Sequence, residues 1–185
     1  MIPDQSAAQL GATVFISDDV PRKEEQELME ALEELGFAGS AKEMPTVRSA
    51  DMVEAIAVLM IPATAFLNAL GASVATDAYD KFKRGLARVF RRHADSGDAG
   101  TGAGVGAGAG QPIVLKDVQT GLQILIGSDL PNEAYSALTS LHLEEFRVGP
   151  LHWDQMLRRW RSIADEALRA SERFTVADAV VATDD

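Results

Sequence analysis

The chain has 185 residues without a cysteine, and its 28 acidic and 17 basic residues give a formal net charge of −11 at pH 7. The lack of cysteine excludes disulfides, thiolate metal sites and thiol nucleophiles, and the acidic balance argues against nucleic acid as a partner. With 46% apolar and 24% charged residues, the composition is typical of a folded chain, and the length favours one domain.

The first residues predict a short disordered lead over 1–10. This stretch lacks the basic patch and apolar run of a secretory signal, so we expect a cytoplasmic protein. A β-branched and aromatic stretch at 12–17 predicts a buried strand. Pro21 and leucines at helical spacing then predict a helix over 21–35, and residues 44–47 predict a second strand at a sheet edge, where Pro45 is tolerated.

An uncharged stretch of 22 residues runs from Ala55 to Thr76 and predicts a helix that begins near Ser49. Its length meets the criterion for a membrane span. Its alanines, Pro62 and polar residues lower its hydropathy, and a span would leave strands unpaired on both sides of a bilayer. We therefore favour a helix buried in the protein, while a membrane span and an interfacial helix stay as alternatives.

Residues 77–92 predict an amphipathic, basic helix. Its apolar residues share one face, and its basic residues surround the rest. This surface could meet anionic lipid or nucleic acid, although pairing with the many acids of 24–34 is the simpler interpretation. The basic residues that we take as candidates for interaction are Lys81, Arg84, Arg88, Arg91 and Arg92.

Glycine and alanine dominate residues 96–110, which predicts a flexible tether. Its match to a dinucleotide-binding glycine pattern lacks the required strand before it and helix after it. Residues 113–118 and 122–126 flank a turn with Gly121, which predicts an antiparallel hairpin.

Two more helices are predicted towards the C-terminus. One begins near Pro131, and the other follows from apolar residues three and four apart between Trp153 and Ala167. Trp153 and Trp160 would then lie two turns apart on one face, as core anchors or as a hydrophobic groove for a partner. A disordered acidic tail is expected over 174–185.

These elements together predict an α/β (α+β) fold of ferredoxin-like order: β-α-β, long helix, β-hairpin, helix, helix. A lone β-α-β unit and a lone hairpin would each leave unpaired edges. We therefore predict one small mixed sheet packed on helices, in a single domain made of 11–95 and 111–173, with the glycine-rich tether as an insertion.

No pattern of catalytic or metal-binding residues emerges. His142 with Glu144, and His152 with Asp154, each lack a third ligand and the i, i+4 spacing of helical zinc sites. Asp18 and Asp19 end the first strand, where turn formation and the helix dipole explain them as well as catalysis does. We predict no catalytic residue, metal or cofactor, which leaves enzymatic activity uncertain but disfavoured.

The pattern resembles the effector-associated constant component family of actinobacterial conflict systems. The similarity lies in the short strand and helix, the uncharged stretch AIAVLMIPATAFLNAL, the arginine-rich KFKRGLARVFRR and the following hairpin and helix, over residues 12–141. This resemblance implies a non-enzymatic accessory protein that works beside a separate effector in a bacterial defence system.

The sequence thus favours a non-enzymatic interaction or accessory module with a protein partner or self-association. The alternative is a membrane-associated regulator at the inner face of the membrane, anchored through residues 55–76 and 77–92.

Overall fold

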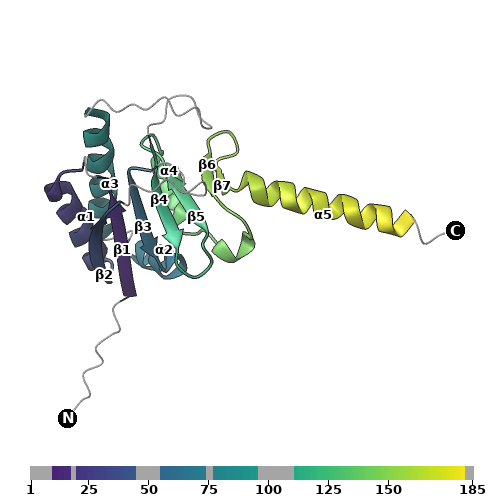
Figure 1. Ribbon diagram of the computed structural model, residues 1–185, viewed down its shortest axis with the longest axis horizontal. Helices are drawn as coiled ribbons and strands as arrows, with labels where there is room; N and C mark the ends of the chain where they lie inside the picture. The colour runs from purple at the N-terminus through teal and green to yellow at the C-terminus, as the bar shows by residue number, and fades with distance from the viewer. Residues whose placement is uncertain (1–9, 18–19, 45–54, 74–76, 96–110, 182–185) are drawn as a thin grey trace, which may run out of the picture.

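A five-stranded mixed sheet forms the centre of the molecule (Figure 1). The computed structural model describes residues 10–17, 20–44, 55–73, 77–95 and 111–181. The strands of this sheet are β1 (Leu10–Ile16), β2 (Phe37–Glu43), β3 (Ala57–Ile61), β4 (Ile113–Asp117) and β5 (Gln123–Ile126). The helices are α1 (Arg22–Glu34), α2 (Ala63–Ala72), α3 (Asp77–Asp95), α4 (Asn132–Leu138) and α5 (Ile163–Val181), with a short 3-10 turn at Leu143–Glu145 and a hairpin of β6 (His152–Asp154) and β7 (Arg159–Arg161). The predicted α/β class with a small mixed sheet is confirmed.

The sheet joins two parallel pairs that run against each other. Its order is β2-β1-β3-β4-β5. β1 and β2 are parallel, as are β3 and β4, while β1 pairs with β3 and β4 with β5 in antiparallel fashion. Since β3 precedes the glycine-rich segment 96–110 and β4 follows it, strands from both sides of that segment are neighbours in one sheet.

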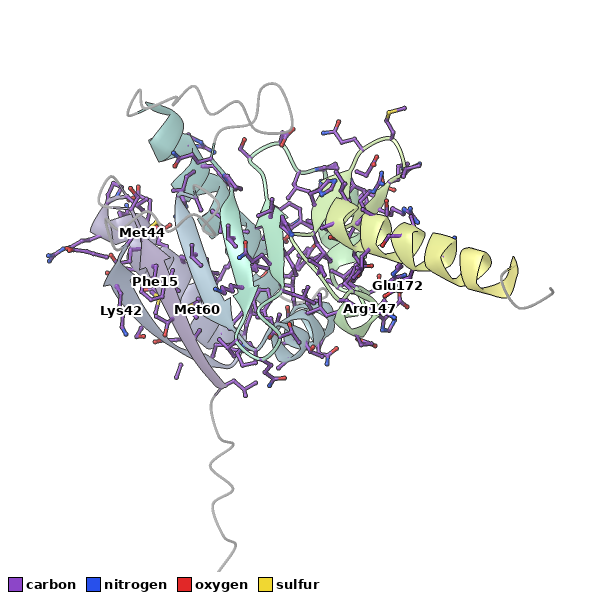
Figure 2. The ribbon with its side chains drawn as sticks, turned by 45° about the vertical axis from the view of Figure 1, so that its right-hand side comes forward. Phe15, Lys42, Met44, Met60, Arg147 and Glu172 are labelled. Carbon is purple, nitrogen blue, oxygen red and sulfur yellow. The ribbon has the colours of Figure 1, made fainter. Side chains whose placement is uncertain are left out.

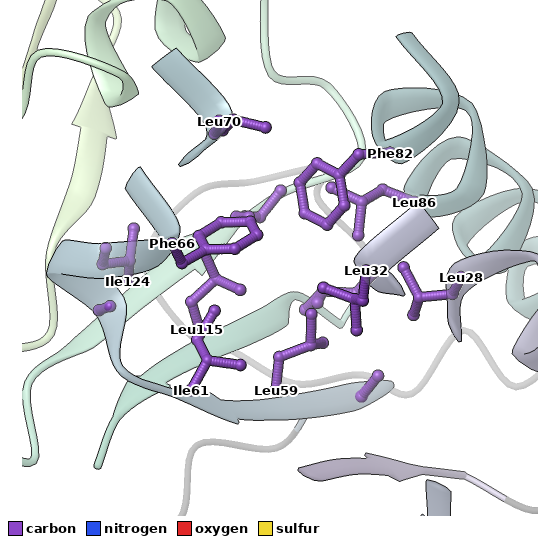
Figure 3. Close-up of a cluster of buried hydrophobic side chains, with 14 of the residues drawn as sticks. Leu28, Leu32, Leu59, Ile61, Phe66, Leu70, Phe82, Leu86, Leu115 and Ile124 are labelled. Atoms are coloured by element: carbon purple, nitrogen blue, oxygen red, sulfur yellow. The ribbon is translucent and has the colours of Figure 1, made fainter. Parts of the chain in front are cut away.

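Helices α1, α2, α3 and α4 contribute to a main core with one face of the sheet. In its centre, the Phe66 ring meets Phe37 and Phe82 edge-on, with ring centroids 5.8 and 5.2 Å apart. Figure 3 shows Phe66 beside Phe82 in this core. Leucines of α1 and α3, including Leu28, Leu32 and Leu86, surround these rings and are fully buried. Each such side chain contributes about 1.5–3 kcal/mol by leaving water.

The uncharged segment 55–76 contains a strand followed by a helix, so the single long helix predicted there is wrong. β3 ends at Ile61, Pro62 follows, and α2 begins at Ala63. The stretch reads as continuously apolar because β3 is central in the sheet, with Leu59 buried in the main core and Val58 buried on the opposite face. α2 buries Phe66, Leu67 and Leu70.

The second strand also differs from the prediction. β2 lies at Phe37–Glu43, before the predicted strand at 44–47, of which residues 45–47 lie outside the described residues. Its sequence is poor in β-branched residues, so its strand state depends on pairing with β1 and on the buried Phe37 side chain. The expected ferredoxin-like order is therefore replaced by an order with the additional central strand β3 and two parallel pairs.

The predicted helix between Trp153 and Ala167 is wrong in its first half. Residues 152–161 form the β6–β7 hairpin, and α5 begins only at Ile163. The hairpin turn is held by Asp154 Oδ1, which accepts the amides of Met156 (3.0 Å) and Leu157 (2.9 Å). α5 runs on to Val181 and so includes residues 174–181, for which the sequence predicted a tail.

Candidate protein-binding face of the sheet

The face of the sheet that looks away from the main core carries two rows of side chains across all five strands. Residues paired between neighbouring strands point to the same side of a sheet. One row is Lys42, Phe15, Val58, Val114 and Leu125, and the other is Ser40, Thr13, Met60, Lys116 and Gln123. We call these ten residues the open face.

An apolar cluster lies at the centre of the open face. Val58 and Val114 are 7% and 3% exposed, and the partly buried Phe15, Met60 and Leu125 pack around them. Ala55 and Met44, which flank the ends of β3 and β2, complete this cluster. No helix in the described part of the chain contributes a residue to this cluster. Figure 2 labels Phe15, Met44 and Met60 of the cluster and the neighbouring Lys42.

The charge on the open face is opposite in sign to that of the whole chain. Lys42 is exposed and Lys116 is half-buried, and none of the ten residues is a carboxylate. The chain as a whole has a net charge of −11. The face therefore offers apolar contact area with positive groups beside it, a combination that suits an apolar surface edged with carboxylates.

Sequence reasoning missed the open face as a site. The sequence of β1 does signal a strand with two different faces. Its buried residues Ala12, Val14 and Ile16 alternate with the partly exposed Thr13 and Phe15. The cross-strand neighbours of Phe15, however, come from β2 and β3. Their assembly into one surface depends on the sheet order.

The predicted basic residues lie on α3, and two of them pair with acids of α1. Lys81 Nζ lies 2.5 Å from Glu34 Oε1, and Arg88 pairs with Glu27. These are the contacts expected for a solvated basic helix face, and exposed pairs of this kind contribute about 0–1 kcal/mol each. Arg84 and Arg91 are exposed, and the side chain of Arg92 lies outside the described part of the chain.

The two tryptophans meet across the β6–β7 hairpin, not along a helix. Trp153 pairs with Trp160, with ring centroids 5.8 Å apart and an edge-to-face angle of 65°. Trp160 is 6% exposed, and its Nε1–H donates to the carbonyl of Ala134 in α4 at 3.0 Å. Trp160 therefore anchors the hairpin to α4, and Trp153 packs against the main core while partly exposed.

The structure describes the two histidine pairs that were weighed as metal ligands. His142 Nδ1 lies 3.2 Å from Glu144 Oε1 on the surface. Burial and the nearby Arg161 guanidinium lower the pKa of His152. The carboxylates of Asp154 and Glu166 raise this pKa, but their effect is smaller. Within the described ranges, no three His, Asp or Glu residues group as a metal site would require. Asp18 and Asp19 lie outside the described residues.

The described helices include none with enough length and apolar character to cross a bilayer.

The chain matches no family model, no curated protein and no solved structure.

Proposed function

We propose that this protein is a non-enzymatic interaction module that binds a protein partner on its open face. The observation that supports this proposal is the apolar cluster around Val58 and Val114, which is separate from the main core and receives no described helix. Sheets of α/β proteins usually have both faces covered. A sheet face that no described helix covers and that carries partly exposed apolar side chains is typical of an interaction surface.

The occupant that fits this face is an amphipathic helix of the partner with carboxylates beside its apolar stripe. The five strands span four spacings, or about 19 Å, which is the length of about 13 helical residues. Apolar residues at i, i+3, i+4 and i+7 of such a helix can pack on the partly buried side chains of Phe15, Met60 and Leu125. Its carboxylates would then lie within reach of Lys42 and Lys116, and these pairs would favour an acidic partner over a basic one.

The accessory role in a bacterial conflict system rests on the family resemblance of residues 12–141. A helical partner on the open face suits such a role, because an accessory component acts by binding a separate effector. An effector encoded beside this chain would support that assignment. Neighbouring genes without any NTPase-like or protease-like effector would argue against it.

The alternative of a membrane-associated regulator loses the anchor on which it was based. Residues 57–61 are a central strand of the sheet, and α2 buries Phe66, Leu67 and Leu70 in the main core. The basic residues Lys81 and Arg88 pair with α1. We therefore do not propose it.

The binding experiment compares charge reversal on the open face with charge reversal elsewhere. The purified chain, the double variant Lys42→Glu/Lys116→Glu and the control variant Lys23→Glu on α1 would each capture partners from a lysate of the native host. We expect one stoichiometric protein with the wild type and the control, and about tenfold weaker capture with the double variant, a difference of about 1.4 kcal/mol.

Hydrogen exchange of the captured complex then locates the contact. Protection is expected in β1, β3 and β4, and the captured protein should contain an acidic amphipathic helix. Failure to recover a partner, or equal capture by all three proteins with protection elsewhere, would contradict the proposal.

A further inference from the structure

β2 forms one edge of the sheet (Figure 1), and no strand of the described residues pairs with its outer side. Its seven residues pair one-for-one with β1, from Leu10↔Phe37 to Ile16↔Glu43, so the strand contains no bulge. Residues 37–41 also contain neither a charge nor a proline. Bulges, charges and prolines are features that keep an edge strand from pairing with another chain. The first five residues of β2 lack all three.

Hydrogen bonds in the sheet show which backbone groups of β2 point outward. The amide of Met44 donates to the carbonyl of Ile16 at 2.9 Å, so the backbone groups of Met44 face β1. Along a strand these groups alternate in direction, and the N–H and C=O of one residue share a direction. The N–H and C=O groups of Gly39, Ala41 and Glu43 therefore point away from β1. This row of donors and acceptors matches the backbone of another extended segment.

Helix α1 borders the outer edge on one side of the sheet. A Cβ atom on Gly39 would collide with the methyl group of Met29, so Met29 packs directly over the middle of β2. Glu25 and Glu33 lie about one turn before and after Met29 on the same side of α1. Glu25 is half-buried and Glu33 is exposed, and the ion pairs between α1 and α3 use other acids of α1. The side of α1 above the edge thus combines an apolar centre with two carboxylates.

The spacing along α1 places these carboxylates at definite levels of β2. α1 connects two parallel strands and so runs opposite to them. Four helical residues span about 6 Å, which is the length of about two strand residues. Met29 marks the middle of the strand. Glu33 therefore lies level with Phe37, near its start, and Glu25 lies level with Ala41, near its end.

We infer that the outer edge of β2 binds an extended segment of a partner protein, which adds a strand to the five-stranded sheet. The segment has an apolar residue at its centre, for contact with Met29. It has a basic residue two positions away on each side, for contact with Glu25 and Glu33. Arg22 lies further along the same side of α1, towards Glu43, and these two opposite charges offset each other. The edge is independent of the open face, because its backbone groups point within the plane of the sheet.

A second copy of this chain does not fit the edge. Antiparallel pairing of β2 with β2 would bring the same side of α1 from both copies together. Glu25 and Glu33 of one copy would then face those of the other, and like charges placed opposite each other are repulsive. The net charge of −11 on each chain adds to this repulsion. The edge therefore favours a different chain with basic residues.

Hydrogen exchange of the free, full-length chain tests whether the edge is open. The outward amides of Gly39 and Ala41 should exchange about a hundredfold faster, or more, than those of Ser40 and Lys42, which point to β1. Equal protection of the two sets would show that the outer side is already covered and would overturn the inference.

A synthetic peptide, acetyl-TKTVTKT-amide, then tests binding. It carries valine at its centre and lysine two positions away on each side. In an NMR titration of the full chain, the outward amides should show saturable shifts with a dissociation constant of about 1 mM or lower. The peptide acetyl-TETVTET-amide should bind about tenfold more weakly or worse. Shifts that are absent, or equal affinity for the two peptides, would overturn the inference.

Two variants locate the contact. Ala41→Pro removes one outward donor at a position where an edge strand tolerates proline, so its urea transition should be unchanged and its affinity for the lysine peptide about tenfold lower. Glu33→Lys should weaken binding by about the same factor. The control Glu144→Lys makes the same charge change at an exposed position of the 3-10 turn after α4 and should bind normally. Wild-type affinity in either test variant would overturn the inference, and Glu33→Lys decides the question if Ala41→Pro does not fold.

Discussion

Asp117 connects three parts of the structure through one buried carboxylate. It is 4% exposed at the end of β4. Its Oδ1 accepts the amide of Ala63 at the start of α2 (2.8 Å), and its Oδ2 accepts the amide and the hydroxyl of Thr120 in the hairpin turn (2.8 and 2.6 Å). The carboxylate therefore caps α2 and shapes the β4–β5 turn at the same time.

Asp117→Ala is expected to lower the free energy of unfolding by about 2–4 kcal/mol. The substitution leaves the buried amide of Ala63 without its acceptor and removes two further bonds from the turn. Urea denaturation measures this change. The control Glu30→Ala, at an exposed position of α1, should shift the value by less than about 0.5 kcal/mol. A similar value for both variants would show that Asp117 has no capping role.

The stabilisation by Asp117 should depend on pH. Burial raises the pKa of its carboxyl, but the hydrogen bonds from the Thr120 hydroxyl and from the amides of Ala63, Thr120 and Gln119 outweigh burial and hold the pKa below its ordinary value of 3.8. A pKa that is lower in the folded state stabilises the fold above the unfolded value, and this contribution disappears as the pH falls through the folded value.

Urea denaturation of the wild type and Asp117→Asn over a pH series tests this dependence. The difference in unfolding free energy should be constant at neutral pH and should shrink only below about pH 4. A difference that shrinks between pH 7 and pH 5 would assign the effect to another group.

Among the elements, α2 packs against side chains of β2 and α3. Phe66 projects from α2 between Phe37 of β2 and Phe82 of α3 and is fully buried. Edge-to-face contacts with two rings add about 0.5–1.5 kcal/mol per pair to the burial of its area. The side chain thus links three elements in the middle of the main core.

Phe66→Ala is expected to destabilise the protein by about 3–5 kcal/mol, because it leaves a cavity among side chains that can only partly close it. Phe66→Leu, which keeps most of the volume, should lower stability by clearly less. Chemical denaturation with tryptophan fluorescence measures both values. Equal losses in the two variants would mean that ring contacts, not the filled volume, stabilise this position.

Some elements could be predicted because local sequence is sufficient to form them. The β4–β5 hairpin has two apolar strands around a turn in which Gly121 adopts a φ of +75°, a conformation that favours glycine. The β6–β7 hairpin was missed because its residues also recur at steps of three and four. The start of α5 had a local signal in Ser162, whose Oγ accepts the amide of Asp165 at 3.2 Å, as a helix cap does.

At the scale of the whole molecule, the two sides of segment 96–110 depend on each other. β3 pairs with β4 along its whole length, and Asp117 from the second side caps α2 from the first. Separated from its counterpart, each side would leave an apolar strand with an unpaired edge, and such edges promote aggregation.

Fragments 1–95 and 111–185, produced in the same cell, are expected to purify as a one-to-one complex with the circular dichroism spectrum of the intact chain. Each fragment alone should aggregate or remain unfolded. The control Leu115→Asp in the second fragment would place a charge in the main core and should abolish the complex. Two fragments that fold as stable separate monomers would contradict the interdependence of the two sides.

The sequence by itself determined the α/β class, the first strand and helix, the basic helix α3, the β4–β5 hairpin and α4. In each of these, the alternation of apolar residues, a proline or a glycine specifies the local conformation. Tertiary structure decided the rest. β2 has few strand-forming residues and depends on β1. β3 could not be told from a helix by composition, because this central strand carries apolar side chains on both of its faces. The open face was not predicted because it depends on the order of the strands. Its two rows come from five strands, and only the pairing of these strands puts Lys42, Phe15 and Lys116 on one surface.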